Sequence, residues 1–515
     1  MLSLLSPLLL GMAVTPGVER VVMKFGGSSV RDAERITEVC KLVKDQIDEN
    51  GLRPHLVCSA MGKTTNNLLA AADEAINDGK VDLSAVRDLH AETAKLLNLE
   101  ETSEYGEVKE LIDECERILE GVSMLGELSP RTRDRVVSYG ERMSGRMVAA
   151  SLTINHDVPA TQIESWDLGV LTDSNFGDAQ ILDACWPTIR EKVNEIKPAT
   201  VGVITGFIGK DVDGAITTLG RGGSDLTASL IGAAAGYDEV QVWKDVDGIL
   251  SADPRICPDA IPVPRVSFSE AAELAYFGAK VLHPVAMQPA VRADMPVRVK
   301  NSYNPTAPGT LITADWTAKG LVSAITSKSG VAMVDITSTR MLGAYGFLAT
   351  VFESFKKNKL SVDVVATSEV SVSLTLNKGG VQVLNKPDVD GPCDPLSGEL
   401  CADDIFDESL KGVFNDLVEV ADLQIKENRA IVTLIANVQE SSNVMAVVFQ
   451  VLSALGVRAR QQHADWSTQP PLLSLLTPPS LPPSLSLSLS CVHTGPGGDD
   501  LPGRVEGKHL CRRPR

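Results

Sequence analysis

The stretch Thr217–Ala228, read as TTLGRGGSDLTA, restricts the possible folds more than any other part of the chain. An apolar, β-branched run at 215–219 leads into three glycines, and a helical pattern opens at Ser224 and Asp225. Glycine lets backbone N–H groups approach a ligand, and a helix start adds free donors at the positive end of its dipole. The pattern predicts a strand, a glycine turn and a helix that bind an anion. A plain tight turn, with Asp225 complementing the dipole, is the alternative.

Length and charge narrow the classes of protein. A chain of 515 residues predicts more than one domain. Its formal net charge of −19 disfavours nucleic acid and anionic membranes, so a small anion must be bound by local groups such as the planar fork of Arg221. The cysteines form no CxxC pair or His/Cys cluster, so no protein ligands for a metal are assigned. Residues 1–19 contain an apolar run too short to span a membrane, and they are interpreted as a remnant of a targeting segment.

Two segments near the N-terminus carry chemistry. The run 20–25 predicts a buried strand, and its Lys24 stands just before Gly26 and Gly27, where it could reach a phosphate or simply be solvated. A second strand at 55–58 precedes SAMGKTTNNLL, which resembles the end of a P-loop. Val57 occupies the position where that motif requires glycine, so a Walker A site is excluded. Thr64 and Thr65 remain candidate hydroxyl donors or plain helix caps.

Strands and helices alternate through the next part of the chain. Charged helical segments at 81–125 and 128–147 include Glu141, which is either solvated or points into a pocket and holds an ammonium group. A continuous apolar strand is expected at 201–208, strands at 239–243 and 296–300, and a helix at 267–282 capped by Ser269. The order predicts an α/β fold, with a mostly parallel sheet covered on both faces.

The pattern changes in the C-terminal part. A strand at 331–336, a helix at 346–358 and strands at 361–366 and 369–376 give the βαββ order of a ferredoxin-like module. A Gly/Pro/Asp-rich stretch at 377–407 predicts a flexible insertion. A second strand and helix, at 430–436 and 443–455, start another module. After Val457 the chain becomes rich in Pro, Ser and Leu, where no packed strand is expected, so the second module is predicted to be incomplete.

Collected in order, these motifs resemble the aspartate kinases of the monofunctional plant type. The matching stretches are VMKFGGSSV, SAMGKTTNNLL, TLGRGGSDLTA, VWKDVDGILSADPR, FGAKVLHP, VRVKNSYNPTAPGT, TRMLGAYGFLA and SVDVVATSEVSVSLTLN. The resemblance covers roughly residues 20–457 and implies an amino-acid-kinase fold followed by two ACT modules. The implied divisions are a catalytic domain at 20–315, a first ACT module at 325–380, an insertion and helix at 381–424, an incomplete second module at 425–462 and a low-complexity, disordered tail at 463–515.

The resemblance also implies an activity. The γ-phosphoryl group of ATP, with Mg²⁺, would pass to the side-chain carboxylate of L-aspartate, opening the route to lysine, threonine, methionine and isoleucine. Because that carboxylate is already ionised at neutral pH, no general base is needed, and catalysis consists mainly of positioning and charge neutralisation. Feedback inhibition by lysine, a homodimer through the ACT modules and a chloroplast location, or alternatively a cytoplasmic one, are expected by the same resemblance. Neither nucleic acid nor a membrane is expected as a partner.

Site roles follow by position from the resemblance. Lys24 and Asp225 are expected at the reaction centre. The implied aspartate-binding residues are Thr64, Glu141, Arg221 and Ser224, with Thr65 as the alternative to Thr64. The implied ATP-binding residues are Lys24, Gly26, Gly27, Ser28, Lys244, Asp245, Arg255 and Lys280. The implied lysine-binding residues are Met341, Gly346, Phe347, Leu348, Val362 and Asp363.

Two departures and two alternatives stand beside this interpretation. Leu250 occupies the position of a nucleotide-side tyrosine in some bacterial relatives, and the tail replaces the expected end of the second ACT module. We interpret that tail as the product of a retained intron or a mispredicted gene model. The alternatives for function are an amino-acid kinase for another acyl substrate, and a non-catalytic amino-acid sensor whose kinase half has decayed.

Overall fold

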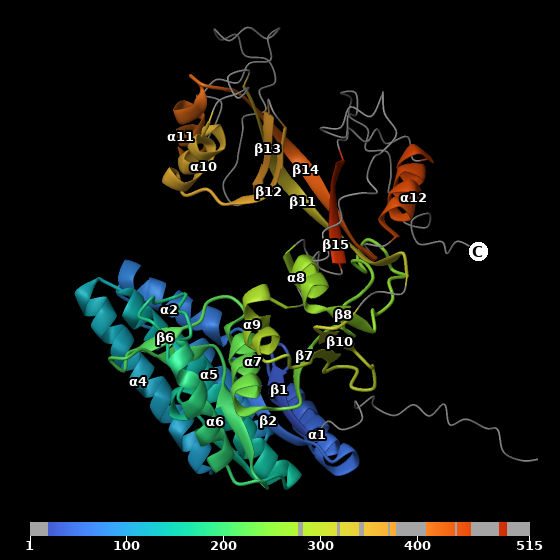
Figure 1. Cartoon of the computed structure of the whole chain (residues 1–515). Helices are drawn as coiled ribbons and strands as arrows, with labels where there is room; N and C mark the ends of the chain where they lie inside the picture. The colour runs from blue at the N-terminus through green and yellow to red at the C-terminus, as the bar shows by residue number, and fades with distance from the viewer. Residues whose placement is uncertain are drawn as a thin grey trace, which may run out of the picture. The chain divides into compact units, whose positions relative to one another are not determined.

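The computed structural model describes residues 19–276, 282–316, 320–338, 345–368, 371–376, 408–437, 440–454 and 484–491 (Figure 1). The chain forms two compact units, which divide between residues 318 and 319. This division falls between the predicted catalytic domain and the predicted first ACT module. Among the described residues, no helix is both long enough and apolar enough to cross a membrane.

The first unit is built on an eight-stranded sheet with the strand order β3-β4-β2-β1-β7-β9-β10-β8. Strand β1 lies in the middle and pairs in parallel with β2 on one side and β7 on the other. Among the described pairings of this sheet, only that of β10 with β9 is antiparallel. The strands are β1 Arg20–Phe25, β2 Arg53–Cys58, β3 Ala160–Ile163, β4 Val201–Thr205, β7 Glu239–Lys244, β8 Arg265–Ser267, β9 Val297–Asn301 and β10 Thr310–Thr313.

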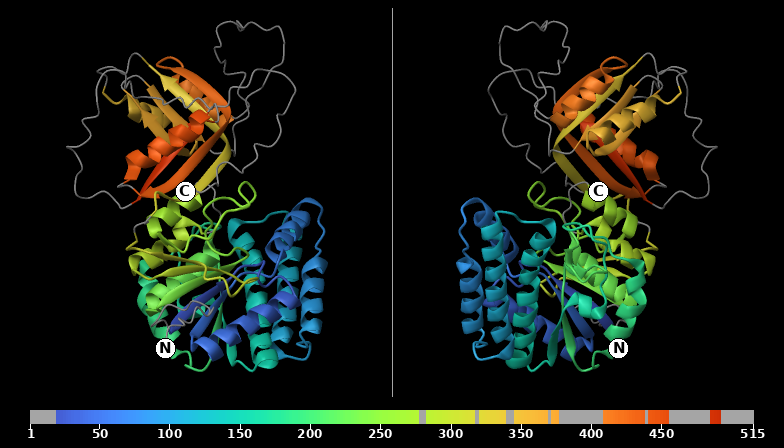
Figure 2. Two further views of the ribbon diagram at one scale, coloured as in Figure 1. Left: turned by 90° about the vertical axis from the view of Figure 1, so that its right-hand side faces the viewer. Right: turned by 90° about the vertical axis from the view of Figure 1, so that its left-hand side faces the viewer.

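Helices cover both faces of this sheet, as predicted (Figure 2). One layer contains α1 and α5, with α2, α3 and α4 packed beside them, and α6, α7 and α9 lie together on the other face. The helices are α1 Ala33–Asn50, α2 Thr64–Asn77, α3 Ser84–Leu96, α4 Ser103–Leu125, α5 Pro130–His156, α6 Trp186–Glu195, α7 Gly223–Ala235, α8 Phe268–Tyr276 and α9 Pro284–Arg292, with short 3₁₀ turns η1 Ser165–Leu168 and η2 Asp183–Cys185.

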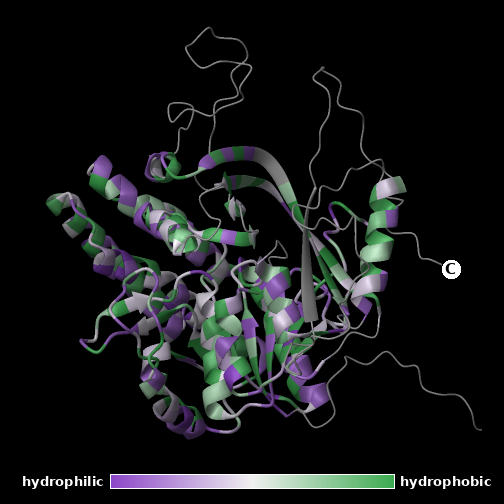
Figure 3. Cartoon of the chain, turned by 45° about the horizontal axis from the view of Figure 1, so that its top comes forward, coloured by the Kyte–Doolittle hydropathy of each residue, from purple (hydrophilic) through white to green (hydrophobic). Residues whose placement is uncertain are grey.

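Alternation along β1 separates the core from the site. Val21, Met23 and Phe25 belong to the hydrophobic cluster built with α1 and α5, so the intervening Val22 and Lys24 point to the opposite face, on which α7 lies. Helix α7 is buried along its whole length, which explains its apolar sequence, whereas other helices carry stripes of hydrophilic and hydrophobic residues (Figure 3).

Two local predictions for this unit are wrong. The apolar run 201–208 is not one strand: β4 ends at Thr205, and Ile208 begins a separate antiparallel hairpin, β5 Ile208–Lys210 with β6 Ile216–Thr218. The strand that enters the glycine stretch is therefore β6 of this hairpin and not part of the main sheet. The break falls at Gly206 and Phe207, where Phe207 has a φ of +70°.

The predicted cap of the helix after β8 is also corrected. The Ser267 hydroxyl, not that of Ser269, accepts a hydrogen bond from the Glu270 N–H at 3.1 Å, and the Glu270 carboxylate accepts one from the Ser267 N–H at 2.7 Å. This reciprocal pair is a capping box, in which a serine and a glutamate three residues later satisfy each other's backbone. The sequence SFSE contains both serines, and only Ser267 has glutamate at that spacing.

The second unit contains a five-stranded sheet with the order β12-β13-β11-β14-β15, antiparallel at every described pairing. The predicted βαββ order is confirmed by β11, α10, β12 and β13. The elements are β11 Val322–Thr337, α10 Phe347–Lys357, β12 Val362–Thr367, β13 Ser371–Leu376, α11 Glu408–Leu417, β14 Asp422–Asn437, α12 Ser441–Ala454 and β15 Ser484–Cys491. Helices α10 and α11 pack together over an apolar core that includes Phe355 and Val413.

Strand β15 contradicts the prediction that the tail contains no packed strand. Residues 484–491 pair antiparallel with β14 over the register Ala430↔Cys491 to Asn437↔Ser484. Their sequence, SLSLSLSC, alternates apolar and polar residues with a period of two, which is the period of a strand. The low complexity of the segment concealed this pattern. The predicted insertion at 377–407 lies outside the described residues.

Candidate active site

A cavity of about 270 Å³ opens at the carboxyl ends of β1 and β2, beside the N-terminus of α7. In open parallel sheets, ligands bind outside the carboxyl ends of strands, at the place where neighbouring crossovers run in opposite directions. Strand β1 lies at such a place, because β2 and β7 flank it. The cavity is lined by Lys24, Ser59, Thr65, Glu141, Phe207, Gly220, Gly222, Gly223, Ser224 and Asp225.

Two lysines meet over one buried carboxylate. The Lys24 Nζ lies 2.6 Å from Asp225 Oδ1, and the Lys244 Nζ lies 3.5 Å from Asp225 Oδ2. Burial raises the pKa of Asp225, but the two ammonium groups outweigh it and hold that pKa below its usual range. The cluster carries two positive charges and one negative charge, so one positive charge is left uncompensated. Such a centre attracts a phosphate group.

The glycine stretch is confirmed as a close turn around a helix start. Gly220 and Gly222 have φ values of +65° and +77°, the left-handed region that favours glycine. A Cβ on Gly223 would lie 2.7 Å from the Phe207 ring. Among the described residues, no side chain caps the N-terminus of α7, so its first N–H groups can serve a bound anion.

The position of Ser224 is set by a second close approach, between Gly206 after β4 and the start of α7. A Cβ on Gly206 would lie 2.7 Å from the Ser224 Cβ, so glycine is needed where β4 ends against α7. The Ser59 hydroxyl, directly after β2, donates a hydrogen bond to the Ser224 Oγ at 3.0 Å. Three successive carboxyl ends, those of β1, β2 and β4, therefore contribute to one wall of the site.

Glu141 enters the cavity from α5. Its side chain is only 3% exposed, and its Oε1 accepts a hydrogen bond from the Ala60 N–H at 3.2 Å. Its buried Oε2 has no hydrogen-bond partner among the described residues. Burial raises the pKa of Glu141 to about 8. A buried carboxylate oxygen without a partner, on a residue that lines a cavity, is suited to a positively charged ligand group, because an unpaired buried charge is costly.

The glycines after β1 and the threonines after β2 lie next to this wall. A Cβ on Gly27 would lie 2.8 Å from the Ala60 carbonyl, and a Cβ on Gly26 would lie 3.6 Å from the Lys24 Nζ. Thr64 is fully buried, whereas Thr65 lines the cavity. The geometry favours Thr65, the alternative left open by the sequence, over Thr64. Ser28 is exposed.

Several predicted nucleotide and aspartate residues do not line the cavity. Lys244 is one of them, and it adjoins the cavity through Asp225. Arg221 and Asp245 are exposed. The Arg255 guanidinium is 85% exposed and pairs with the Asp253 carboxylate at 2.6 Å. Lys280 lies outside the described residues. The assignments of Arg221, Asp245, Arg255 and Lys280 to ligands remain predictions.

The predicted lysine-binding residues belong to the second unit. Gly346, with a φ of +88°, precedes α10, whose first residues are Phe347 and Leu348. Val362 begins β12, and the next residue, Asp363, pairs with Lys328 at 2.8 Å. Met341 lies outside the described residues. The role of this set stays a prediction.

Sequence reasoning missed Ser59 and Phe207. Both follow a strand of the main sheet by one or two residues, at its carboxyl end. That position was the available signal, because side chains just after parallel strands gather at one edge. The apolar run 201–208 concealed Phe207, since the run was interpreted as a single strand.

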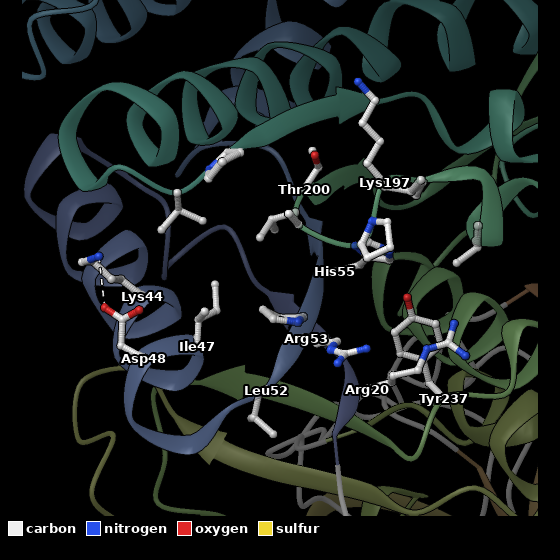
Figure 4. A pocket seen from close by; sticks show the side chains of 18 of the residues that line it. Arg20, Lys44, Ile47, Asp48, Leu52, Arg53, His55, Lys197, Thr200 and Tyr237 are labelled. Atoms are coloured by element: carbon white, nitrogen blue, oxygen red, sulfur yellow. Dashed lines mark ion pairs between the residues drawn. The ribbon is translucent and has the colours of Figure 1, made fainter.

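A second and larger cavity, of about 430 Å³, lies at the opposite, amino ends of the same strands. Figure 4 shows Arg20 beside the ring of Tyr237, and Lys44 paired with Asp48. The Arg20 Nη2 also donates to the Asn194 Oδ1 at 3.2 Å. The charged groups of this amino-end cavity are therefore mostly engaged with neighbouring side chains.

Comparison with known proteins agrees with this geometry. The model of the amino acid kinase family matches residues 19–301. The chain is 46% identical to aspartokinase 3, chloroplastic, of Arabidopsis thaliana over 85% of this chain and 76% of that protein. It resembles crystal structures of E. coli aspartokinase III at 30% identity with a TM-score of 0.66. One, in complex with aspartate and ADP, is matched over 87% of this chain and 94% of that chain. Another, in complex with lysine and aspartate, is matched over 86% and 94%.

The chain therefore belongs to the amino acid kinase family, and within it to the aspartokinases. This confirms the family, the fold class and the kinase activity predicted from the motifs.

Proposed function

We propose that the chain transfers the γ-phosphoryl group of ATP to the side-chain carboxylate of L-aspartate, giving 4-phospho-L-aspartate. The observation that carries the proposal is the meeting, in one cavity, of an anion-binding cluster and an unpartnered carboxylate. Lys24, Lys244 and the start of α7 provide the first, and Glu141 provides the second. The anion-binding cluster suits the phosphates of the donor. The unpartnered carboxylate suits the ammonium group of an amino-acid acceptor.

The acceptor half of the site is assigned to α5 and α7. The Glu141 Oε2 would accept from the ammonium of aspartate, while Ser224 and Thr65 hydroxyls contact its carboxylates. Arg221 stands on the glycine turn and would close onto the α-carboxylate, since a guanidinium matches a carboxylate with two parallel hydrogen bonds. Its exposure in the structure fits a side chain that is free to move onto the ligand.

The donor half of the site is assigned to β1, β7 and the loops after them. Lys24 and Lys244 would neutralise phosphate charge as it develops, and Asp225 pairs with both ammonium groups. Gly26 and Gly27 leave room for phosphates over the turn after β1. Mg²⁺ commonly keeps several waters and binds through substrate phosphates. The described residues contain no group of three potential metal-ligating side chains, so the nucleotide would bring the ion.

Regulation and location rest on the relatives. A related E. coli structure contains lysine, and the second unit carries the segments predicted to bind it. We propose feedback inhibition by lysine, a homodimer formed through the second unit, and a chloroplast location as in the Arabidopsis relative.

The test is ADP release by the purified full chain with ATP and Mg²⁺, with L-aspartate, L-glutamate or N-acetyl-L-glutamate as acceptor, and with or without lysine. We expect release only with L-aspartate and a decrease with lysine. ADP release with another acceptor would identify that acceptor as the substrate in place of L-aspartate. Lysine binding by calorimetry without any acceptor-dependent turnover would instead indicate a sensor.

A further inference from the structure

A buried carboxylate outside the cavity holds the segments that frame the glycine turn. Asp134, in the second turn of α5, is 3% exposed. Its Oδ2 accepts hydrogen bonds from the Thr218 N–H at 2.8 Å and the Gly177 N–H at 3.0 Å, and its Oδ1 accepts one from the Thr218 hydroxyl at 2.9 Å. One side chain therefore joins a helix, the end of β6 and the loop 173–180.

Both of those segments touch the glycine turn. Thr218 is the last residue of β6 and stands two residues before Gly220. A Cβ on Gly220 would lie 2.4 Å from the Asp178 Oδ1, so the loop 173–180 lies directly against the turn. The Thr218 carbonyl also accepts a hydrogen bond from the Ala179 N–H at 2.9 Å, which ties the loop to β6 a second time.

The same helix carries Glu141. Residues 134 and 141 are seven apart, so they lie on one face of α5, two turns or about 10 Å along the axis. Helix α5 thus sets the distance between the carboxylate that faces the acceptor ammonium and the turn that carries Arg221 and Ser224.

We propose that Asp134 is a positioning residue for the acceptor site, which fixes the glycine turn relative to Glu141. It touches neither substrate and acts through Thr218 and Gly177. This inference rests on the proposed function. Loss of Asp134 should therefore weaken the use of aspartate more than the use of ATP, because Lys24 and Lys244 are held on β1 and β7.

Two substitutions at Asp134 separate positioning from charge. In Asp134→Asn, the amide oxygen can take the place of Oδ2 and the amide NH₂ can donate to the Thr218 hydroxyl, so the three bonds remain possible. Asp134→Ala removes the acceptor of the buried Thr218 N–H and of the partly exposed Gly177 N–H. We expect Asp134→Ala to raise the aspartate KM by about tenfold or more and Asp134→Asn by about threefold or less, with the ATP KM within about twofold in both.

Asp211 offers a matched control at the other end of the same hairpin. It is also a buried carboxylate, and it accepts from the Ala215 N–H at 2.8 Å, the Asp213 N–H at 3.1 Å and the Ser174 hydroxyl at 3.0 Å. Ala215 and Asp213 lie at the end of the hairpin remote from the glycine turn, and Ser174 lies near the start of the loop 173–180, four residues before the Asp178 that meets the turn. Asp211→Ala should therefore leave the aspartate KM within about twofold of wild type.

The measurement is initial-rate ADP release at varied aspartate and varied ATP, with thermal unfolding of each variant. Wild-type turnover is recorded first, because its absence would count against the proposed function and not against Asp134. Equal rises in both KM values in Asp134→Ala, or the same rise in Asp211→Ala, would overturn the positioning role. If Asp134→Ala does not fold, Thr218→Val removes only the hydroxyl bond: a two- to fivefold rise in the aspartate KM, about the loss of one hydrogen bond, supports the role, and an unchanged KM overturns it.

Discussion

The two cavities at the ends of the parallel strands differ in volume and in the state of their charges. The amino-end cavity has about 430 Å³ and the carboxyl-end cavity about 270 Å³. At the amino end, Lys44 and Arg53 are 40% and 63% exposed and pair with exposed carboxylates. At the carboxyl end, Lys24 and Asp225 are 9% and 7% exposed. Exposed pairs are screened by water and contribute little, whereas buried charges interact strongly with each other and with a ligand.

Burial and incomplete pairing of charges, and not volume, distinguish these two cavities. The smaller cavity holds an excess positive charge and a carboxylate oxygen without a partner. Both features cost free energy in the absence of ligand, and both are relieved when an anion and an ammonium group bind.

Strand β1 provides the sharpest test, because a basic residue stands at each end. Lys24→Met should lower kcat by about 10³-fold, since a preorganised cation at the transferring phosphoryl group is lost and Asp225 keeps only the more distant Lys244. Arg20→Met, at the amino end of the same strand, should change kcat by less than about twofold. Steady-state ADP release measures both. Similar losses in the two variants would mean that the strand, and not the cavity, is the sensitive element.

Glu141 gives the next effect, which depends on pH. Burial raises its pKa to about 8, so below that pH the carboxyl of the free enzyme is protonated and cannot face an ammonium group with a negative charge. The kcat/KM for aspartate should rise toward pH 8, by up to about tenfold per pH unit, and then level off. Glu141→Gln should lower kcat/KM at pH 8 and remove this rise. The rise would persist in Glu141→Gln if another group controlled aspartate binding.

Arg221 is predicted to have a smaller and more selective effect. Arg221→Ala should raise the aspartate KM by about tenfold, with the ATP KM nearly unchanged, because one charge-assisted contact with the acceptor is lost. Arg221→Lys keeps the charge but not the planar fork, and it should recover only part of the loss. Steady-state kinetics with each substrate varied in turn measures the change in the aspartate KM and in the ATP KM separately. A rise in the ATP KM of the same size would assign the glycine turn to the nucleotide.

The difference between the two cavities was only partly accessible from the sequence. Lys24, Ser224, Asp225 and Lys244 were predicted from the resemblance, because each belongs to a contiguous motif similar to those of the aspartate kinases. Asp134 has no such signal: its partners are 43 and 84 residues away, so only the tertiary structure brings them together. The sequence pattern also does not predict which of the two basic residues of β1, Arg20 or Lys24, is buried. The packing of α7 decides which of them is desolvated.

The smallest effect is expected for the Lys44–Asp48 pair of the amino-end cavity. The two side chains are four residues apart on α1, 3.0 Å between charged atoms, and 40% and 56% exposed. Such a pair is worth about 0.3–0.5 kcal/mol, and less with lysine as the first residue. Lys44→Ala should thus lower the free energy of unfolding in urea by only a few tenths of a kcal/mol, about the value of one exposed pair, and leave both KM values unchanged. A clear rise in either KM would show that this larger cavity contributes to turnover, and the contrast between the two strand ends would then lose its basis.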